Sequence, residues 1–206
     1  MNTISVQDDA ELIDRTNAWT EASLLAFTSP QKIIQLPAGN TPLALYRSWE
    51  LTRPAFLNGL LFQQVDDVIT GPKSGCFKSF FNEHLPSYQK QFLPLTGSPV
   101  VPGIAILGIG ANGHLAFHEP EINITLNYGC VQLSESTCAG LGVTAPTWGL
   151  TYGAGHFARC KALLIIAKGK NKRPILEKAM SEIEPTSPLS YILKIHSNCT
   201  LIIDRV

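Results

Sequence analysis

The chain has 206 residues, and its 16 Lys and Arg residues are balanced by 16 Asp and Glu residues. This length suits one domain with a sizeable hydrophobic core, since single cores stop growing at roughly 250–300 residues. A net charge of zero without a long basic run excludes the electrostatic footprint of a nucleic-acid or anionic-membrane binder. We therefore expect no nucleic-acid or membrane partner, and we expect any anionic ligand to be small.

The N-terminal sequence and the cysteines indicate the compartment. The start, MNTISVQDDAELID, lacks the basic and apolar regions of a signal peptide. The five cysteines contain no CxxC pair, which argues against a disulfide framework and against a thiolate zinc site. We expect a cytoplasmic protein with reduced thiols, and its oligomeric state stays open.

The predicted elements alternate along the chain between strands and helices. Short, nearly continuous apolar runs are typical of strands covered on both faces of a parallel sheet, and they lie at 33–36, 60–65, 104–107, 162–167 and 201–203. Helical spacing of apolar residues or a helix-start signal predicts helices over Asp9–Phe27, Thr41–Leu51, Lys172–Met180 and Pro188–Leu193.

This alternation predicts an α/β fold with three layers and a mostly parallel central sheet, built as one domain over residues 1–206. At the start of the second helix, Thr41 is expected to be the N-cap, with Pro42 at the first helical position. The segment Pro86–Pro102 is rich in Pro and Gly and predicts a surface loop. The segment Glu121–Tyr152 shows no clear pattern, and its structure stays open.

Ligands of open α/β sheets bind beyond the carboxyl ends of the strands. The glycine turn Gly39-Asn40-Thr41 follows the first apolar run and leads into a helix start, where free backbone N–H groups can bind a phosphate. The alternative is a plain capped helix. A second strand end carries the cations Lys168, Lys170, Lys172 and Arg173, which oppose the dipole of the following helix unless an anion lies nearby. A solvated basic loop is the favoured reading of Lys168 and Lys170.

The segment Gly108–Gly113 matches the dinucleotide-binding pattern GxGxxG after a strand. Pro120 limits any helix that follows, and no acidic residue ends a second strand about twenty residues further on. We therefore reject a nicotinamide cofactor, while the glycines still allow the backbone to approach a ligand closely.

His114, His118 and Glu119 raise two hypotheses. Two histidines four residues apart can share a metal, but the order differs from the zinc protease motif and no third ligand follows at a recognisable spacing. A histidine beside a carboxylate fits acid–base chemistry better, so we expect no metal. His118 has a strong structural alternative, as a histidine that pairs with a buried backbone group.

Asp66 and Asp67 end an otherwise apolar strand. One of them is a candidate general base, and the alternative is a helix or turn cap.

Taken together, these segments resemble the glucosamine-6-phosphate and galactosamine-6-phosphate isomerases (deaminases). The resemblance covers most of the chain and rests on LPAGNTPLALY, QVDDV, SGCFKSFFNEHL, ILGIGANGHLAFHEP, IIAKGKNKRPIL and IHSNCTLIID. It implies a modified Rossmann-like fold shared with 6-phosphogluconolactonases. It also implies that an amino-sugar 6-phosphate becomes a keto-sugar 6-phosphate with loss of ammonia, without a metal or organic cofactor.

The resemblance implies roles for single residues. Asp66 is the implied base that moves a proton between C2 and C1, and His114 the implied group that assists ring opening, held by Glu119. The implied phosphate-binding groups are Gly39, Asn40, Thr41 and Lys172.

The chain also departs from that family. Asn112 stands where many glucosamine-6-phosphate deaminases have Asp, and an amide can orient the histidine but cannot supply charge. Asn112 and the Cys of SGCFKSFF favour the galactosamine-6-phosphate branch. The expected phosphate-binding arginine has no clear counterpart, Arg159 being the nearest candidate. The basic residues of an allosteric site are missing from Glu121–Val131, so we expect no amino-sugar effector.

Two other functions stay open at this point. A 6-phosphogluconolactonase shares the fold and a related Gly-His loop, although the carboxylate of Glu119 argues against it. A non-catalytic sugar-phosphate-binding protein would fit Asn112 and the missing arginine.

Overall fold

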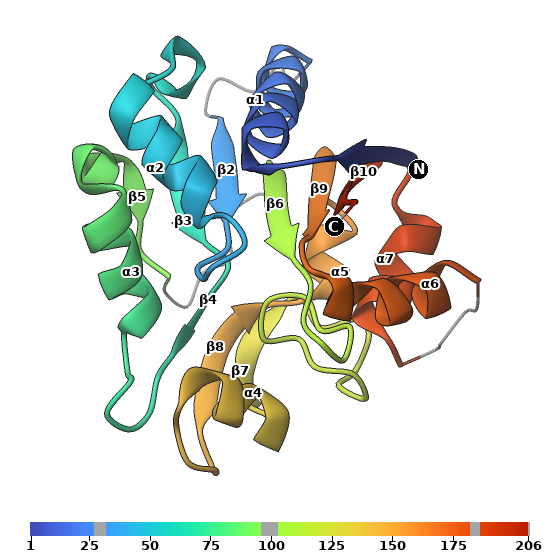
Figure 1. The fold of residues 1–206 in the computed structure, drawn as a ribbon. Coiled ribbons are helices and arrows are strands. Elements are labelled where there is room, and N and C mark those ends of the chain that lie inside the picture. The colour runs from blue at the N-terminus through green and yellow to red at the C-terminus, as the bar shows by residue number, and fades with distance from the viewer. Residues whose placement is uncertain (27–31, 96–102, 182–185, 206) are drawn as a thin grey trace.

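Seven parallel strands form the central sheet of the computed structural model, which describes residues 1–26, 32–95, 103–181 and 186–205 (Figure 1). The strands are β1 (Asn2–Val6), β2 (Ile33–Leu36), β3 (Leu61–Gln64), β5 (Phe92–Leu93), β6 (Ile104–Gly108), β9 (Ala162–Ala167) and β10 (Cys199–Asp204). Their order is β1-β10-β9-β6-β2-β3-β5, and every neighbouring pair is parallel. The chain builds the sheet outward in both directions from β2 and β6, which makes the gap between these two strands the topological switch point.

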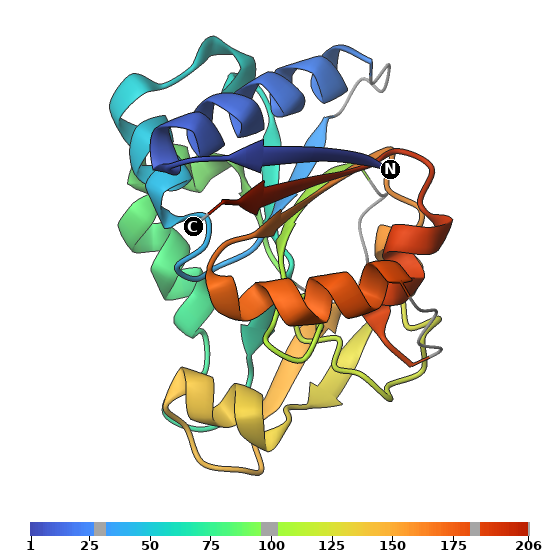
Figure 2. The same cartoon turned by 45° about the vertical axis from the view of Figure 1, so that its right-hand side comes forward.

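Helices cover both faces of this sheet, so the predicted three-layer α/β fold is confirmed (Figures 1 and 2). One face packs against α1 (Asp9–Leu25), α2 (Leu43–Thr52) and α3 (Cys76–His84), and the other against α5 (Ala154–Phe157), α6 (Arg173–Ser181) and α7 (Pro188–Ile195). Successive strand residues point to opposite faces, which is why the predicted strands are mostly apolar on both faces. On β6, for example, Ile106 enters one core and Leu107 the other.

A smaller antiparallel sheet lies beyond the carboxyl ends of the central strands, at the lower end of Figure 1. It consists of β4 (Asp66–Val68), β8 (Trp148–Tyr152) and β7 (Tyr128–Gln132), in that order. The helix α4 (Glu135–Leu141) packs on it through a small third core that includes Val68, Phe117 and Cys138. Three short 3₁₀ turns complete the described elements, η1 (Ala55–Leu57), η2 (Pro86–Gln91) and η3 (Lys170–Lys172). Among the described residues, no helix combines the length and apolar character needed to cross a lipid bilayer.

Most predicted elements are confirmed, and β2 and β9 have the predicted bounds. The predicted Thr41 cap is wrong, because α2 begins at Leu43 and Pro42 precedes it without a side-chain capping bond. The predicted loop Pro86–Pro102 is wrong where the structure describes it, since η2 and the edge strand β5 occupy its first part. Residues 96–102, and the predicted helix end at Phe27, lie outside the described residues.

A buried polar network joins the small sheet to the central one. Tyr152 donates its hydroxyl hydrogen bond to Gln63 Oε1 at 2.8 Å, and His156 Nε2 lies 2.9 Å from Gln35 Oε1. Gln35 on β2 and Gln63 on β3 are themselves buried within the sheet. Burial, helped by the nearby positive charge of Arg159, lowers the pKa of His156 to about 4. The network therefore holds a neutral histidine at neutral pH.

Replacing His156 with Gln should reduce the acid sensitivity of the fold. An unfolded histidine titrates near 6.5, so the unfolded chain binds a proton that the folded chain excludes as the pH falls from about 6.5 to about 4. The free energy of unfolding of the native protein should fall by about 2 kcal/mol more than that of His156→Gln between pH 7 and pH 5. Urea unfolding at both pH values measures the difference, and equal losses in the two proteins would contradict the assignment.

Candidate active site

A cavity of about 420 Å³ lies where the strands β2, β3, β6 and β9 end. The segments that follow these four adjacent strands supply its lining, including Thr41, Asp66, His114 and Lys172. The end of β6 and the turn after β2 lie close together, because a Cβ on Gly108 would lie 3.7 Å from Thr41 Oγ1. The cavity thus opens at the switch point, where ligands of open α/β sheets bind.

Asp66 and Asp67 point into different parts of the molecule. Asp66 lines the cavity, whereas Asp67 lines a second cavity of about 420 Å³ on the other side of β4. Asp67 Oδ1 accepts hydrogen bonds from the backbone N–H groups of Val68 and Phe77, and Oδ2 from Lys78 N–H and the Gln64 amide, at 2.9–3.0 Å. Asp67 is therefore a helix cap, the alternative given for this pair, since it fixes the start of α3. Asp66 remains the candidate general base.

Asp66 is only 5% exposed, and no hydrogen bond from a described residue reaches its carboxyl group. Burial raises its pKa well above the ordinary value, and the negative charge of Asp67 raises it further. A desolvated carboxylate with a raised pKa is a stronger proton acceptor than one in water. Asp66 has the environment of a general base.

A glycine-rich turn after β6 places His114 in the cavity. Gly110 N–H donates to the carbonyl of His114 at 3.0 Å, and Gly113 takes a positive φ of 86° and donates to the carbonyl of Gly110. A Cβ on Gly110 would overlap the imidazole of His114. The turn needs glycine at 110 so that the histidine ring can lie flat against the backbone.

Glu119 and Asn112 hold this histidine from behind. His114 Nδ1 lies 3.4 Å from Glu119 Oε2, and Asn112 bridges the two by accepting from His114 N–H at 3.2 Å and donating to Glu119 Oε2 at 2.8 Å. The structure therefore brings together three of the predicted residues in one hydrogen-bonded group. The amide of Asn112 can donate a hydrogen bond to Glu119, whereas an ionised carboxylate at this position could only accept one.

Glu119 also binds the start of α4. Its Oε1 accepts hydrogen bonds from the hydroxyls of Ser134 at 2.9 Å and Thr137 at 2.5 Å. Burial alone would raise the pKa of Glu119, but contacts with His114, Thr137 and Asn112 outweigh it and lower the pKa to about 2. Glu119 is therefore an anion at neutral pH.

The position of Glu119 favours one tautomer of His114. The Nδ1 atom is buried, makes no hydrogen bond to a described residue and lies 3.4 Å from a carboxylate that can only accept, so a hydrogen on Nδ1 is the favoured state of the neutral ring. The side chain is 23% exposed and lines the cavity, and its Nε2 makes no hydrogen bond to another described residue. His114 can therefore exchange a proton with a ligand through Nε2, as in a histidine oriented by a carboxylate.

A further part of the cavity lining is suited to an anion. Asn40 and Thr41 line it after the turn at Gly39, which has a φ of 106°. Thr41 does not cap α2, and its hydroxyl makes no hydrogen bond to another described residue. Lys172 enters from η3, and its partial burial lowers its pKa without a carboxylate to pair with among the described residues.

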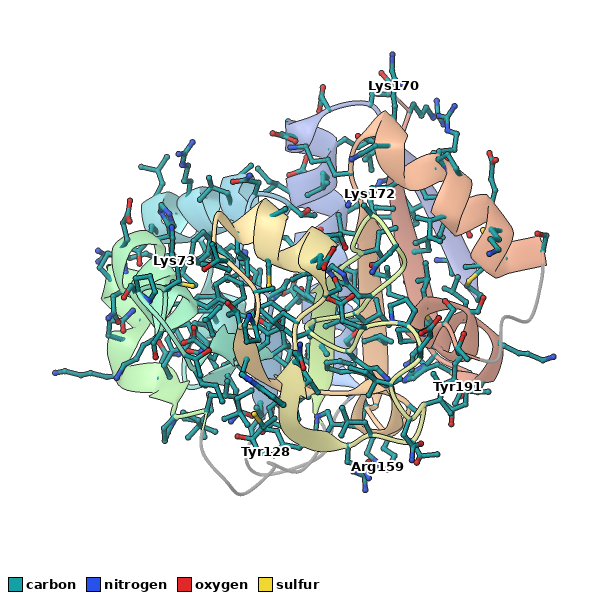
Figure 3. The ribbon with its side chains drawn as sticks, turned by 90° about the horizontal axis from the view of Figure 1, so that it is seen from below. Lys73, Tyr128, Arg159, Lys170, Lys172 and Tyr191 are labelled. Atoms are coloured by element: carbon teal, nitrogen blue, oxygen red, sulfur yellow. The ribbon has the colours of Figure 1, made fainter. Side chains whose placement is uncertain are left out.

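The other cations of this region point elsewhere. Lys168 pairs with Asp9, and Lys170 projects from the edge of the molecule whereas Lys172 lies inward of it (Figure 3). Arg159 precedes β9, at the end of the strand opposite the cavity, and Figure 3 shows it far from Lys172. This position excludes Arg159 as the phosphate-binding arginine.

His118 has the structural role given above as its alternative, that of a histidine paired with a buried backbone group. It is fully buried, and its Nδ1 accepts a hydrogen bond from Ala154 N–H at 2.8 Å. Burial lowers its pKa, so it serves the fold as a neutral acceptor. The described part of the chain contains no group of three or more His, Cys, Asp or Glu side chains placed to hold a metal.

Sequence reasoning missed the residues that close the cavity. Phe77 and Phe117 stack at 5.3 Å between ring centroids and form an apolar wall, and Ser136, Thr137 and Leu141 reach the cavity from α4. The helix α4 lies in the segment Glu121–Tyr152, whose structure had stayed open. The sequence feature that predicts this helix is Ser134 followed by Glu135, which are an N-cap and an acidic residue in the first turn.

Solved structures of other proteins share this fold. A monomeric glucosamine-6-phosphate deaminase matches with a TM-score of 0.78 at 22% identity, over 100% of this chain and 98% of that chain. A 6-phosphogluconolactonase from Leishmania guyanensis matches with a TM-score of 0.79 at 15% identity, over 98% and 96%. The fold is therefore the one that these two groups of proteins share.

Sequence comparison points to one of these groups. The glucosamine-6-phosphate deaminase of Bacillus pumilus (strain SAFR-032) is 27% identical over 240 aligned positions, which cover 100% of this chain and 98% of that protein. That of Alkaliphilus oremlandii (strain OhILAs) is 28% identical over 238 positions, covering 98% and 97%. No protein-family model matches the chain. The resemblance indicated by the motifs is confirmed, and the chain is similar to glucosamine-6-phosphate deaminases over its whole length.

The two neighbouring aspartates should have opposite effects on stability. Asp67→Asn places an amide NH₂ against donors that now bind a carboxylate, and should lower the free energy of unfolding by about 1–3 kcal/mol. Asp66→Asn removes a desolvated charge that Asp67 repels, and should raise the free energy of unfolding. Urea unfolding at pH 7 measures both variants. A larger loss for Asp66→Asn than for Asp67→Asn would contradict the division of roles.

Proposed function

We propose that this chain, as one domain over residues 1–206, is an amino-sugar-6-phosphate isomerase/deaminase of carbohydrate metabolism. Its substrate would be galactosamine-6-phosphate or glucosamine-6-phosphate, and its products a keto-sugar 6-phosphate and ammonia. The observation that carries the proposal is one cavity that holds a desolvated carboxylate, a histidine beside a second carboxylate, and a half-buried lysine that has no acidic partner among the described residues. The full-length similarity to glucosamine-6-phosphate deaminases supports it.

His114 would begin the reaction by opening the sugar ring. The ring oxygen needs a proton while the C1 hydroxyl loses one, and a single imidazole exchanging protons through Nε2 can serve both steps. Glu119 would stabilise the imidazolium that forms between them, since its low pKa keeps it negative. Asn112 would keep the two groups aligned.

Asp66 would then move a proton between two carbon atoms. It takes the proton from C2 of the open-chain amino aldose, and the electron pair shifts toward the C1 carbonyl, whose oxygen takes a proton from the substrate's own ammonium group, to give an enolamine. Returning the first proton from Asp66 to C1 gives the C2 iminium of the ketose. Water adds at C2 and ammonia leaves, so one amino-aldose phosphate and one water give one ketose phosphate and one ammonia.

Lys172 and the turn Gly39-Asn40-Thr41 would bind the phosphate at the other end of the cavity. The lysine supplies charge, and the free Thr41 hydroxyl and nearby backbone N–H groups supply hydrogen-bond donors. No organic cofactor or metal is needed for this chemistry, because a proton next to a carbonyl can be moved by a placed base and acid.

Ammonia release from galactosamine-6-phosphate and glucosamine-6-phosphate tests the proposal. We expect turnover of at least one of them, and we expect Asp66→Asn to lower kcat by about 10²–10⁴-fold while inorganic phosphate still binds. Turnover of neither sugar at millimolar concentration would overturn the proposal. Hydrolysis of 6-phosphogluconolactone would then indicate a lactonase, and tight sugar-phosphate binding without proton exchange at C2 would indicate a binding protein.

Lys172→Gln should raise KM by about 10–100-fold and leave kcat nearly unchanged. The phosphate is remote from the reacting carbons, so its lysine contributes to binding in the ground state and the transition state alike. Lys170→Gln is the matched control, because Lys170 lies in the same 3₁₀ turn and points away (Figure 3). A similar change in KM for both variants, or in neither, would contradict the phosphate assignment.

A further inference from the structure

The two halves of the candidate active site come from separate parts of the fold. Asp66 lies on β4, in the small antiparallel sheet, whereas His114 and Glu119 lie in the loop that follows β6 of the central sheet. A proton-transfer site works only if its base and its acid keep a fixed separation. A contact between the two parts must therefore fix the position of β4 relative to the loop.

Thr151 is where these two parts are joined. On β8 it lies directly opposite Asp66 in the antiparallel register, and the next residue, Tyr152, donates its N–H to the carbonyl of Val65 at 2.9 Å. The hydroxyl of Thr151 accepts a hydrogen bond from Phe117 N–H at 3.0 Å and donates one to the Tyr152 carbonyl at 2.8 Å. Phe117 lies between His114 and Glu119 in the loop.

We propose that Thr151 is a positioning residue that sets the placement of Asp66 relative to His114 and Glu119. It does not line the cavity and is fully buried, so it acts only through the two segments that it joins. The inference rests on the proposed function and adds to it a residue that neither the motifs nor the cavity lining reveals.

The hydroxyl carries this role because it accepts one hydrogen bond and donates another. A valine at 151 would keep the shape of threonine but would leave the N–H of Phe117, itself 3% exposed, without a partner. The loop has a second anchor one residue further on, where His118 accepts from Ala154 N–H. Loss of the first anchor should therefore shift the loop without unfolding it.

Thr151→Val is the test, and Thr20→Val is its matched control. Thr20 is equally buried, and its hydroxyl donates to the carbonyl of Thr16 within α1, away from the cavity. We expect Thr151→Val to lower kcat by about 10–100-fold with KM changed less than about threefold. Thr20→Val should leave both constants unchanged. A kcat for Thr151→Val within about twofold of the native value would overturn the inference.

Two further variants distinguish loss of the hydroxyl from misfolding. Thr151→Ala cannot clash, and should show the same loss of kcat. Thr151→Ser keeps the hydroxyl and should recover at least about a third of the native kcat. A Ser variant as impaired as Ala would mean that the methyl group, and not the hydroxyl, matters, and would overturn the inference.

Hydrogen exchange of the Phe117 amide separates this inference from the proposed function. The bond to Thr151 should protect this amide in the native protein, and exchange should be at least about tenfold faster in Thr151→Val but not in Thr20→Val. If no amino-sugar phosphate is turned over, the proposed function fails and this measurement still reports on the junction. Unchanged exchange of Phe117 would overturn the inference whatever the activity.

Discussion

The carboxylate of Glu119 is the interaction on which the candidate site depends. It is buried, and yet it stays ionised because Asn112, Ser134 and Thr137 donate to it and His114 lies beside it. These donors come from the β6 loop and from the start of α4, so one anion connects the histidine with the helix that closes the cavity. A neutral group here would lose the charge that orients the imidazole and part of the attachment of α4.

The site is polarised although the chain as a whole carries no net charge. Asp66 lines the cavity and Glu119 lies behind His114, so both acids lie beside the proposed proton-transfer groups, whereas Lys172 brings a positive charge to the cavity lining. Parallel topology produces this order, because four neighbouring strands end at the same edge and each delivers a different side chain. Asp67, one residue from Asp66, lies on the other side of β4 and serves the fold instead.

The sequence predicted five strands of the central sheet because both faces of the sheet are buried there, so each of these strands appears as a nearly continuous apolar run. The strand β1 is exposed along much of its length, and β4 contains two aspartates, so neither gave that signal. The candidate residues at the strand ends were predictable from topology alone. Which aspartate faces the cavity was not, because the alternation along β4 becomes known only once its pairing with β8 is known.

In the proposed complex, a sugar phosphate lies along the cavity with its reacting carbons at Asp66. A crystal structure with an open-chain 2-amino-alditol 6-phosphate would show this placement, since this compound has no carbonyl and cannot react. We expect the phosphate within hydrogen-bond distance of Lys172 and the Gly39–Thr41 turn, with C1 and C2 next to the carboxylate of Asp66 and His114 near the C1 end. A phosphate bound at the Asp66 end, or a ligand in the cavity lined by Asp67, would contradict it.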